Sequence, residues 1–326
     1  MNTTHSDLGF TPGSLRSGQR RRGVGGGLEA RANSVTTVAS SNFVKLKIQK
    51  ALKDLPALPE VVNRVLKETE NPDCSAATVE RMLLSDQALT SKVLRVVNSA
   101  YYGLSGQVSN LGQAIVILGV QQIRNLVLSV GAINVFEAKT PRAQEMLRLF
   151  WLHSFGTAAA AHLLAQDRRM PGDEQEAMFV AAIMHDLGKL FLFANFTELY
   201  DDVTKYSRKH DCPILAAEKK MLGLTHCQVG EEMTRRWLLP APLVELIAQH
   251  EGPFTGGESD AVYCVHVGDA VTVHLYHPEE EPPRPIVIDP KAAEWLGRSD
   301  EELAELVSET SGCVEEAARS FGLMAA

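Results

Sequence analysis

Apolar residues recur at helical spacing along most of the chain from residue 43 onward. Leu111, Ile115 and Leu118 follow one another at steps of four and three residues, and Gly119 then ends the run. A second apolar stripe of the same kind begins directly after this glycine. Such stripes are stable in water only when they pack against other helices. Together with the near absence of period-two alternation, the pattern predicts an all-α protein.

Further helices are expected over the ranges 57–69, 76–84, 87–98, 142–166, 174–187, 213–222, 226–237, 241–250 and 260–275. The stretch "HPEEEPPRPIVIDP" at 277–290 is expected to be a connection, because closely spaced prolines cannot donate helical hydrogen bonds. Ser299 and Glu302 then have the spacing of a capping box, which predicts a last helical segment.

Composition places limits on the class of protein. The 326 residues are 45% hydrophobic and 22% charged, as in an ordinary soluble protein, and no apolar run approaches the roughly 18 residues of a membrane-spanning helix. The five cysteines lie far apart, which favours a reducing compartment over a disulfide framework. The net charge of −8 offers no general attraction for nucleic acid. We therefore expect a cytoplasmic protein with no membrane partner and no nucleic-acid partner.

Six polar side chains lie on, or at the end of, helix faces that are otherwise apolar: His153, His185, Asp186, His226, His250 and Asp269. A single histidine on such a face is usually a core residue with a hydrogen-bond partner. Burying each of the six alone would be costly, above all for an ionised Asp, so we expect them to meet in one pocket. The pocket is either a hydrogen-bond network or a metal site. Imidazole and carboxylate without a thiolate favour a divalent Mn, Fe or Zn ion.

Two further positions bear on this pocket. Thr225 and Gln228 have the spacing of a capping box, which makes His226 the first residue of a helix. The helix dipole there favours the neutral imidazole that a metal needs. Lys189 lies four residues after His185 and shares its face if the helix continues, where its ammonium would orient an anion or neutralise a phosphate.

Seven segments of the chain are similar to one known family. The first lobe is matched by "LPALPEVVNRVL" (55–66), "SDQALTSKVLRVVNSAYYG" (85–103) and "LGQAIVILGVQQIRNLVL" (111–128). The second lobe is matched by "FWLHS" (150–154), "AAIMHDLGKL" (181–190), "EKKMLGLTHCQVGEEMTRRWLLP" (218–240) and "VHVGDA" (265–270). With these segments the chain resembles the HD superfamily of metal-dependent phosphohydrolases, and more closely its HDOD branch (HD-related output domain).

Composition and resemblance together divide the chain. They indicate a disordered basic, Gly-rich tail at 1–42, an HDOD domain at 43–310, and a C-terminal helix or tail at 311–326. Within the domain they indicate an N-terminal helical lobe at 43–138, an HD-like lobe at 139–276 and a C-terminal segment at 277–310. The expected architecture is a two-lobed bundle of helices.

The resemblance also implies roles for residues. The positions where catalytic HD enzymes place metal ligands are filled by His153, His185, Asp186, His226, His250 and Asp269. Lys189 matches the lysine of their H-D-x-G-K word, so Asp186 and Lys189 are the catalytic candidates. Two positions depart from the related cyclic-di-GMP phosphodiesterases: Glu251 replaces the second His of a pair, and Leu149 stands where a ligating Glu can occur. Their Gly-Tyr-Pro word is also absent. These departures argue against a three-metal site and leave a one- or two-metal site open.

Two interpretations of function remain. HDOD domains have often lost metal ligands and are generally regarded as bacterial signalling or regulatory modules, which implies binding of a signalling protein or a small nucleotide. The complete ligand set instead favours a metal-dependent phosphohydrolase, in which Lys189 stabilises charge on the transferred phosphoryl group. We expect regulation to be the main function and hydrolysis the alternative.

Overall fold

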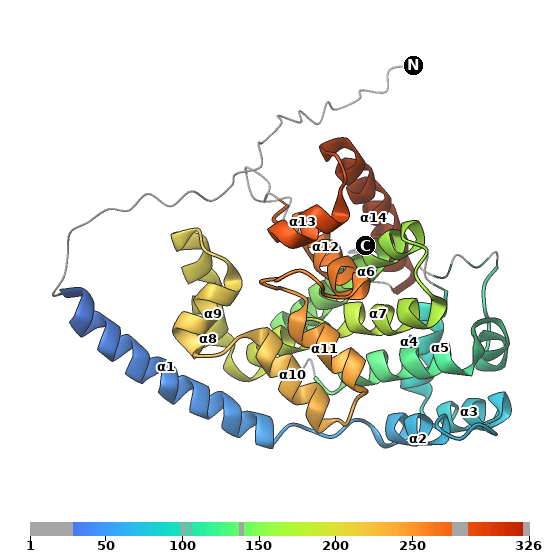
Figure 1. The fold of residues 1–326 in the computed structure, drawn as a ribbon. Coiled ribbons are helices and arrows are strands. Elements are labelled where there is room, and N and C mark those ends of the chain that lie inside the picture. Colours follow the sequence, from blue (N-terminus) through green and yellow to red (C-terminus); the bar gives the residue numbers. More distant parts are fainter. Residues whose placement is uncertain are drawn as a thin grey trace, which may run out of the picture.

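The computed structural model describes the backbone of residues 29–98, 102, 104, 106–136, 140–275 and 286–321. Every regular element in these ranges is a helix, which confirms the all-α prediction (Figure 1). The helices are α1 (Glu29–Lys53), α2 (Glu60–Glu68), α3 (Ala76–Leu83), α4 (Gln87–Val97), α5 (Leu111–Asn134), α6 (Pro141–Asp167), α7 (Gly172–Met184), α8 (Leu187–His210), α9 (Ile214–Leu222), α10 (His226–Arg236), α11 (Ala241–Gln249), α12 (Asp260–Leu275), α13 (Pro290–Leu296) and α14 (Asp300–Phe321).

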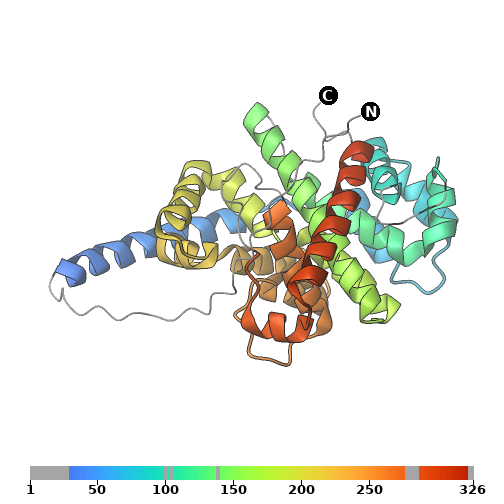
Figure 2. The ribbon, with the colours of Figure 1, turned by 90° about the horizontal axis from the view of Figure 1, so that it is seen from above.

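The first group of helices consists of α2 to α5, which pack against one another. Both views place α2 to α4 at one end of the molecule and α9 at the other (Figures 1 and 2). The predicted interruption at Gly119 is confirmed, because its φ of 84° and ψ of 163° break α5 into two straight parts. Asn98 caps α4, donates to the carbonyls of Leu94 and Val108, and accepts from the Val108 N–H. These bonds fix where the chain enters α5.

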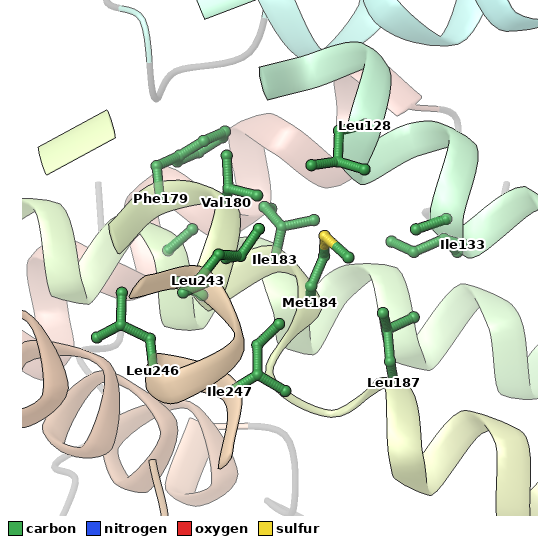
Figure 3. Packing of buried hydrophobic residues seen from close by; sticks show 14 of the residues in the cluster. Leu128, Ile133, Phe179, Val180, Ile183, Met184, Leu187, Leu243, Leu246 and Ile247 are labelled. Carbon is green, nitrogen blue, oxygen red and sulfur yellow. The ribbon is translucent and has the colours of Figure 1, made fainter. Parts of the chain in front are cut away.

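A continuous core joins this group to the remaining helices through α5, α7 and α11. Ile183 and Met184 of α7 lie between Leu128 of α5 and Ile247 of α11 (Figure 3). All four side chains are fully buried, and each such burial stabilises the fold by about 1.5–3 kcal/mol. The core therefore fixes the C-terminal ends of α7 and α11.

The second group is organised around α6 and α12, which pack along each other. Helix α7 lies against both of them, and α10 contacts α8 and α11. Helix α14 also packs along α6. This packing brings the ends of α7, α8, α10 and α11 together beside the middle of α6.

The predicted tail differs from the structure in its extent. Helix α1 begins at Glu29, so the boundary expected at residue 42 lies inside a helix; residues 1–28 are outside the described part. The segment 29–42 contains good helix formers such as Ala, Glu and Arg but no apolar stripe, which is why periodicity missed it. Helix α1 packs on α9 and α10, so residues 43–53 join the second group of helices rather than the expected N-terminal lobe.

Helix α8 was also missed. Its first two turns are apolar on nearly all sides and its later turns are mainly polar, so it shows no single stripe at helical spacing. Toward the C-terminus, the capping box of Ser299 and Glu302 is confirmed by both of its hydrogen bonds. The helix it opens, α14, crosses the boundary expected at residue 310. Pro290 is the first residue of α13, where a missing N–H breaks no helical hydrogen bond. The connection expected over 277–290 therefore ends at residue 289.

Two stretches are long and apolar enough, by composition alone, to cross a membrane: Leu111–Asn134 and Gly172–His210. The sequence contains no uninterrupted apolar run of this length. These two stretches are apolar on average, because their mean hydropathy tolerates scattered polar residues. Inside the fold, 50% of the most apolar part of the first stretch is buried, and 83% of that of the second. Both stretches thus contribute to the protein core.

Candidate metal centre

The six predicted side chains meet at one point of the second group of helices. They come from the middle of α6 (His153), the C-cap of α7 (His185), the N-cap of α8 (Asp186), the first residue of α10 (His226), the C-cap of α11 (His250) and the inner face of α12 (Asp269). His185, His226 and His250 are fully buried. Asp186 and Asp269 are only 4% and 6% exposed. The expectation of a shared pocket is therefore met by the geometry.

The His185–Asp186 pair lies at a break between two helices. Asp186 has φ −96° and ψ 13°, and α8 starts at the next residue, so the helix does not continue as the face argument for Lys189 required. Lys189 reaches the pocket for another reason: it lies in the first turn of α8, with Nζ 2.9 Å from Oδ2 of Asp186. The predicted location of Lys189 is right, but the helical face shared with His185 is not its cause.

The donor atoms form two sets that share Asp186. In the first set, Nε2 of His153 and Nε2 of His185 lie 3.0 Å apart, and Oδ2 of Asp186 is 3.4 and 3.5 Å from them. Oδ1 of Asp269 completes this set at 3.0 and 3.5 Å from the same two nitrogens. In the second set, Nε2 of His226 and Nε2 of His250 lie 3.4 Å apart.

Asp186 connects the two sets through its other oxygen. Oδ1 of Asp186 lies 3.5 Å from Nε2 of His226 and 3.6 Å from Nε2 of His250. Each oxygen of the carboxylate thus faces one set of donors. This is the arrangement of a carboxylate that bridges two cations.

Three of the imidazoles are held in the tautomer that a metal ligand needs. Nδ1 of His185 donates to the Ala182 carbonyl at 2.7 Å, and Nδ1 of His250 donates to the Ile247 carbonyl at 2.8 Å. Nδ1 of His226 lies 2.9 and 3.0 Å from the two oxygens of Glu218. Because Nδ1 carries the proton in each ring, the lone pair of the neutral ring is on Nε2 and points into the pocket.

The buried oxygens indicate that a cation fits this pocket. Oδ1 of Asp186 and Oδ1 of Asp269 accept no hydrogen bond from any residue in the described ranges, although imidazole nitrogens lie within 3.0–3.6 Å. An ionised buried oxygen without a donor is costly, and lone pairs that face one another repel. A divalent ion between these atoms removes both costs. Two or more imidazoles with carboxylates form a donor set suited to first-row transition metals.

The electrostatics of the pocket favour the same conclusion. Burial raises the pKa of Asp186, but the Lys189 ammonium and the neighbouring imidazoles outweigh it and hold that pKa well below its usual range. The pKa of Asp269 is likewise lowered by His153 and His185 against the effect of burial. Burial lowers the pKa of His153, yet Asp186 and Asp269 together raise it to about 9. Without a metal, the carboxylates therefore retain a proton on an imidazole, and metal binding releases it.

The open side of the pocket is bordered by three partly exposed side chains. The exposed fractions of the His153, Lys189 and Glu251 side chains are 15%, 22% and 20%. Nζ of Lys189 lies 3.5 Å from Oε1 of Glu251 as well as 2.9 Å from Asp186. An anionic ligand that enters from this side meets the Lys189 ammonium first.

Glu218 is a functional candidate that the sequence did not reveal. This buried carboxylate on α9 accepts from the ring Nδ1–H and the backbone N–H of His226, and from the Tyr200 hydroxyl at 2.7 Å. Burial raises the pKa of Glu218, but these partners lower it below its ordinary value. A charged residue on the otherwise apolar Ala217–Leu222 face of α9 was the available signal. Glu218 orients His226 and increases the basicity of its Nε2.

We expect Glu218→Gln to weaken binding of the ion beside His226 by about 10–100-fold, because the amide lacks the charge and one acceptor. Titration of metal-free protein with a divalent ion in competition with a chelating dye measures this affinity. Tyr200→Phe is the matched control: it removes one hydrogen bond to Glu218 but keeps the carboxylate, so metal affinity should remain close to wild type. Equal affinities in Glu218→Gln and wild type would contradict the orienting role.

Two of the histidines have further contacts that affect their roles. The capping box of Thr225 and Gln228 is present and His226 is the first residue of α10, as predicted. Burial lowers the pKa of His226, but Cys227 and Glu218 outweigh burial and the Lys189 ammonium and raise it, in contrast to the expectation of a neutral ring. His266 is buried, donates from Nδ1 to the His250 carbonyl and accepts from the Asp289 N–H. It thereby links the end of α11 to the start of α13.

These features define an all-helical protein with a buried histidine–aspartate cluster that could hold a metal ion. The model of the HDOD domain family matches residues 55–253, more than half of the chain, and the chain therefore belongs to this family. The fold is similar to that of an HDOD domain protein of unknown function from Geobacter sulfurreducens, with a TM-score of 0.65 and 23% identity over 89% of this chain and 100% of that one.

Two further relatives are informative. A proposed metal-dependent phosphohydrolase from Shewanella amazonensis shares the fold with a TM-score of 0.61 and 19% identity over 86% of this chain and 99% of that one. The cyclic di-GMP phosphodiesterase CdgJ from Vibrio cholerae is 29% identical over 142 residues, 41% of this chain and 32% of the relative. The chain spans only 38% and 32% of the length of the curated relatives it matches.

Proposed function

We propose that this HDOD protein binds two divalent metal ions on either side of Asp186 and hydrolyses a phosphate ester, with a small nucleotide or cyclic dinucleotide as the substrate class. One observation carries the proposal. Imidazoles whose Nδ1–H groups donate hydrogen bonds outside the pocket direct Nε2 toward each oxygen of Asp186. A pocket prepared in this way on both sides of one carboxylate has the form of a two-ion hydrolytic site.

Each residue has a role that follows from its position. Divalent ions, when bound, neutralise phosphate charge and lower the pKa of a water molecule. Asp186 holds the two positions at a fixed separation, and Asp269 adds negative charge to the first. Lys189 places an ammonium at the open side of the pocket, where it binds a non-bridging phosphate oxygen and stabilises the charge that develops on it. Glu251 orients Lys189 from the opposite side.

The second candidate is a signalling module in which the ions have a structural role and a partner protein or nucleotide binds elsewhere. Deep burial of the donors favours this alternative, since three of the four imidazoles have no exposed surface and substrate access is confined to the side of Lys189. The family and the proposed signalling role of its members agree with it. Both candidate functions include the metal centre, but only the hydrolase converts a phosphate ester into products.

Metal quantification and a hydrolysis screen test both candidates. Protein purified without chelators should contain about two transition-metal ions per chain, and chelation should lower its thermal stability. Cyclic dinucleotides including cyclic di-GMP, nucleoside phosphates and a chromogenic phosphodiester are then assayed with Mn²⁺ and with a chelator. Metal-dependent turnover supports the hydrolase, and metal binding without turnover supports the signalling module. Metal-free protein whose stability is unchanged by chelation rules out the metal centre itself.

A further inference from the structure

Cys227 contributes a sulfur to the second set of donors. It follows His226 in the first turn of α10, is buried, and has Sγ 3.4 Å from Nε2 of His226. Its Sγ, Nε2 of His226 and a ring nitrogen of His250 all lie within 4.8 Å of one another. The sequence analysis expected only imidazole and carboxylate donors, whereas a cysteine sulfur also lies beside this half of the site.

We propose that Cys227 is a thiolate ligand of the second metal position, which makes that position selective for Zn²⁺ over harder ions such as Mn²⁺. The inference rests on the proposed metal centre and specifies one half of it. The donors of the second position are then one sulfur, two imidazole nitrogens and one carboxylate oxygen, from Cys227, His226, His250 and Asp186. The first position retains two imidazoles and two carboxylates, a harder set without sulfur.

Four of the six separations between these donors fit a tetrahedral ion. Zn²⁺ bonds of about 2.0–2.2 Å to nitrogen and oxygen and about 2.3 Å to sulfur place tetrahedral donors about 3.3–3.6 Å apart. The observed separations from Nε2 of His226 are 3.4 Å to Sγ, 3.4 Å to Nε2 of His250 and 3.5 Å to Oδ1 of Asp186. Oδ1 of Asp186 lies 3.6 Å from Nε2 of His250. Nε2 of His226, Nε2 of His250 and Oδ1 of Asp186 therefore have the mutual spacing of one coordination shell, and Sγ of Cys227 has this spacing from His226.

A second observation, independent of the cysteine, indicates a ligand at this place. Oδ1 of Asp186 is buried, points at the two imidazoles of this set and accepts no hydrogen bond from the described residues. Soft thiolate ligands shift selectivity toward Zn²⁺ and away from Mn²⁺ or Mg²⁺, and a coordinated thiol is held as thiolate. The two halves of the site should therefore prefer different ions.

Cys264 offers a matched comparison within the same protein. It is also fully buried and lies on a helix that carries a ligand, α12, but its Sγ faces Sδ of Met170 at 3.8 Å. Burial raises the pKa of the Cys264 thiol to about 12, so this cysteine stays protonated. It represents a buried cysteine whose contribution is packing alone.

Cobalt substitution tests the inference without an activity assay. Metal-free full-length protein is titrated with Co²⁺ and its absorption spectrum recorded, because a thiolate bound to Co²⁺ gives an intense near-ultraviolet charge-transfer band that imidazole and carboxylate do not. We expect the band in wild type and in Cys264→Ala, and its loss in both Cys227→Ala and Cys227→Ser. We also expect added Zn²⁺ to remove the band before the weaker visible bands of the first position.

The outcomes separate the two levels of the argument. Visible Co²⁺ bands without the charge-transfer band in wild type would overturn the role of Cys227 while leaving the metal centre intact. A charge-transfer band that persists in Cys227→Ala or Cys227→Ser would also overturn it. Failure of wild type to bind Co²⁺ at all would instead refute the proposed metal centre. Because the wild-type spectrum alone can refute the proposal, a folding defect in one variant does not remove the test.

Discussion

Asparagine in place of Asp186 is expected to weaken binding at both metal positions by at least about 100-fold, more than the loss typical of a supporting residue. The amide keeps the shape of the side chain but removes the charge, and only one of its two polar atoms can bind a cation. Both sets of donors depend on this side chain, because each of its oxygens lies within 3.6 Å of an imidazole nitrogen of its set. Metal content after dialysis, measured by elemental analysis, should fall well below one ion per chain.

Asp202→Asn is the control for this substitution. Asp202 lies on the same helix, α8, and its exposed carboxylate is 3.5 Å from Nζ of Lys205, far from the pocket. The control should retain the wild-type metal content, and far-ultraviolet circular dichroism should show that both variants remain helical. If Asp186→Asn kept two ions per chain, Asp186 would not bridge them, and its role as the shared ligand would be wrong.

Alanine in place of Gly188 is expected to lower the free energy of unfolding by about 3 kcal/mol or more. A Cβ at this position would lie 1.9 Å from the backbone oxygen of His226 and 2.9 Å from the backbone N of Gly230. These are backbone atoms of α10, which cannot rotate aside as the end of a flexible side chain can. Helices α8 and α10 must therefore separate, and this moves His226 away from Asp186. Urea denaturation followed by circular dichroism measures the loss.

Gly172→Ala is the control for the glycine substitution. Gly172 opens α7, and a Cβ there would meet no atom within 4 Å among the described residues. Its unfolding free energy should stay within about 0.5 kcal/mol of wild type. Wild-type stability in Gly188→Ala would show that α8 and α10 are not in close contact, and the geometry around Asp186 would need to be revised.

The sequence was sufficient to identify the residues of the pocket but not all of its contents. Ionisable side chains on apolar faces are costly unless they meet, so the positions of His153, His250 and Asp269 could be inferred without knowing how the helices pack. Glu218 also lies on an otherwise apolar face, but its partner, His226 on α10, becomes evident only once the helices have packed.

Cys227 was not among the residues expected at the pocket, and Lys189 was expected there for the wrong reason. The face argument assumes that a residue beside a ligand points about 100° away from it on the helix. At a helix end this assumption fails, and consecutive residues can border one pocket. His185 and Asp186 do so at a break between helices, and His226 and Cys227 do so at the start of α10. Helix α8 was missed because its first turns are apolar on nearly every side, so they show no single apolar stripe.

The placement of the candidate ligands on six different helices and helix ends links metal binding to assembly of the whole second group. The donors are drawn from helices that span residues 153 to 269 and acquire their mutual spacing only after those helices have docked. An unfolded chain therefore has no comparable affinity, and each bound ion draws the folding equilibrium toward the native state by mass action. At a free-ion concentration 100 times the dissociation constant, this linkage is worth about 2.7 kcal/mol per site. In the proposed metal centre, a bound cation would therefore stabilise the packing of the second group of helices to an extent that depends on the metal supply in the surroundings.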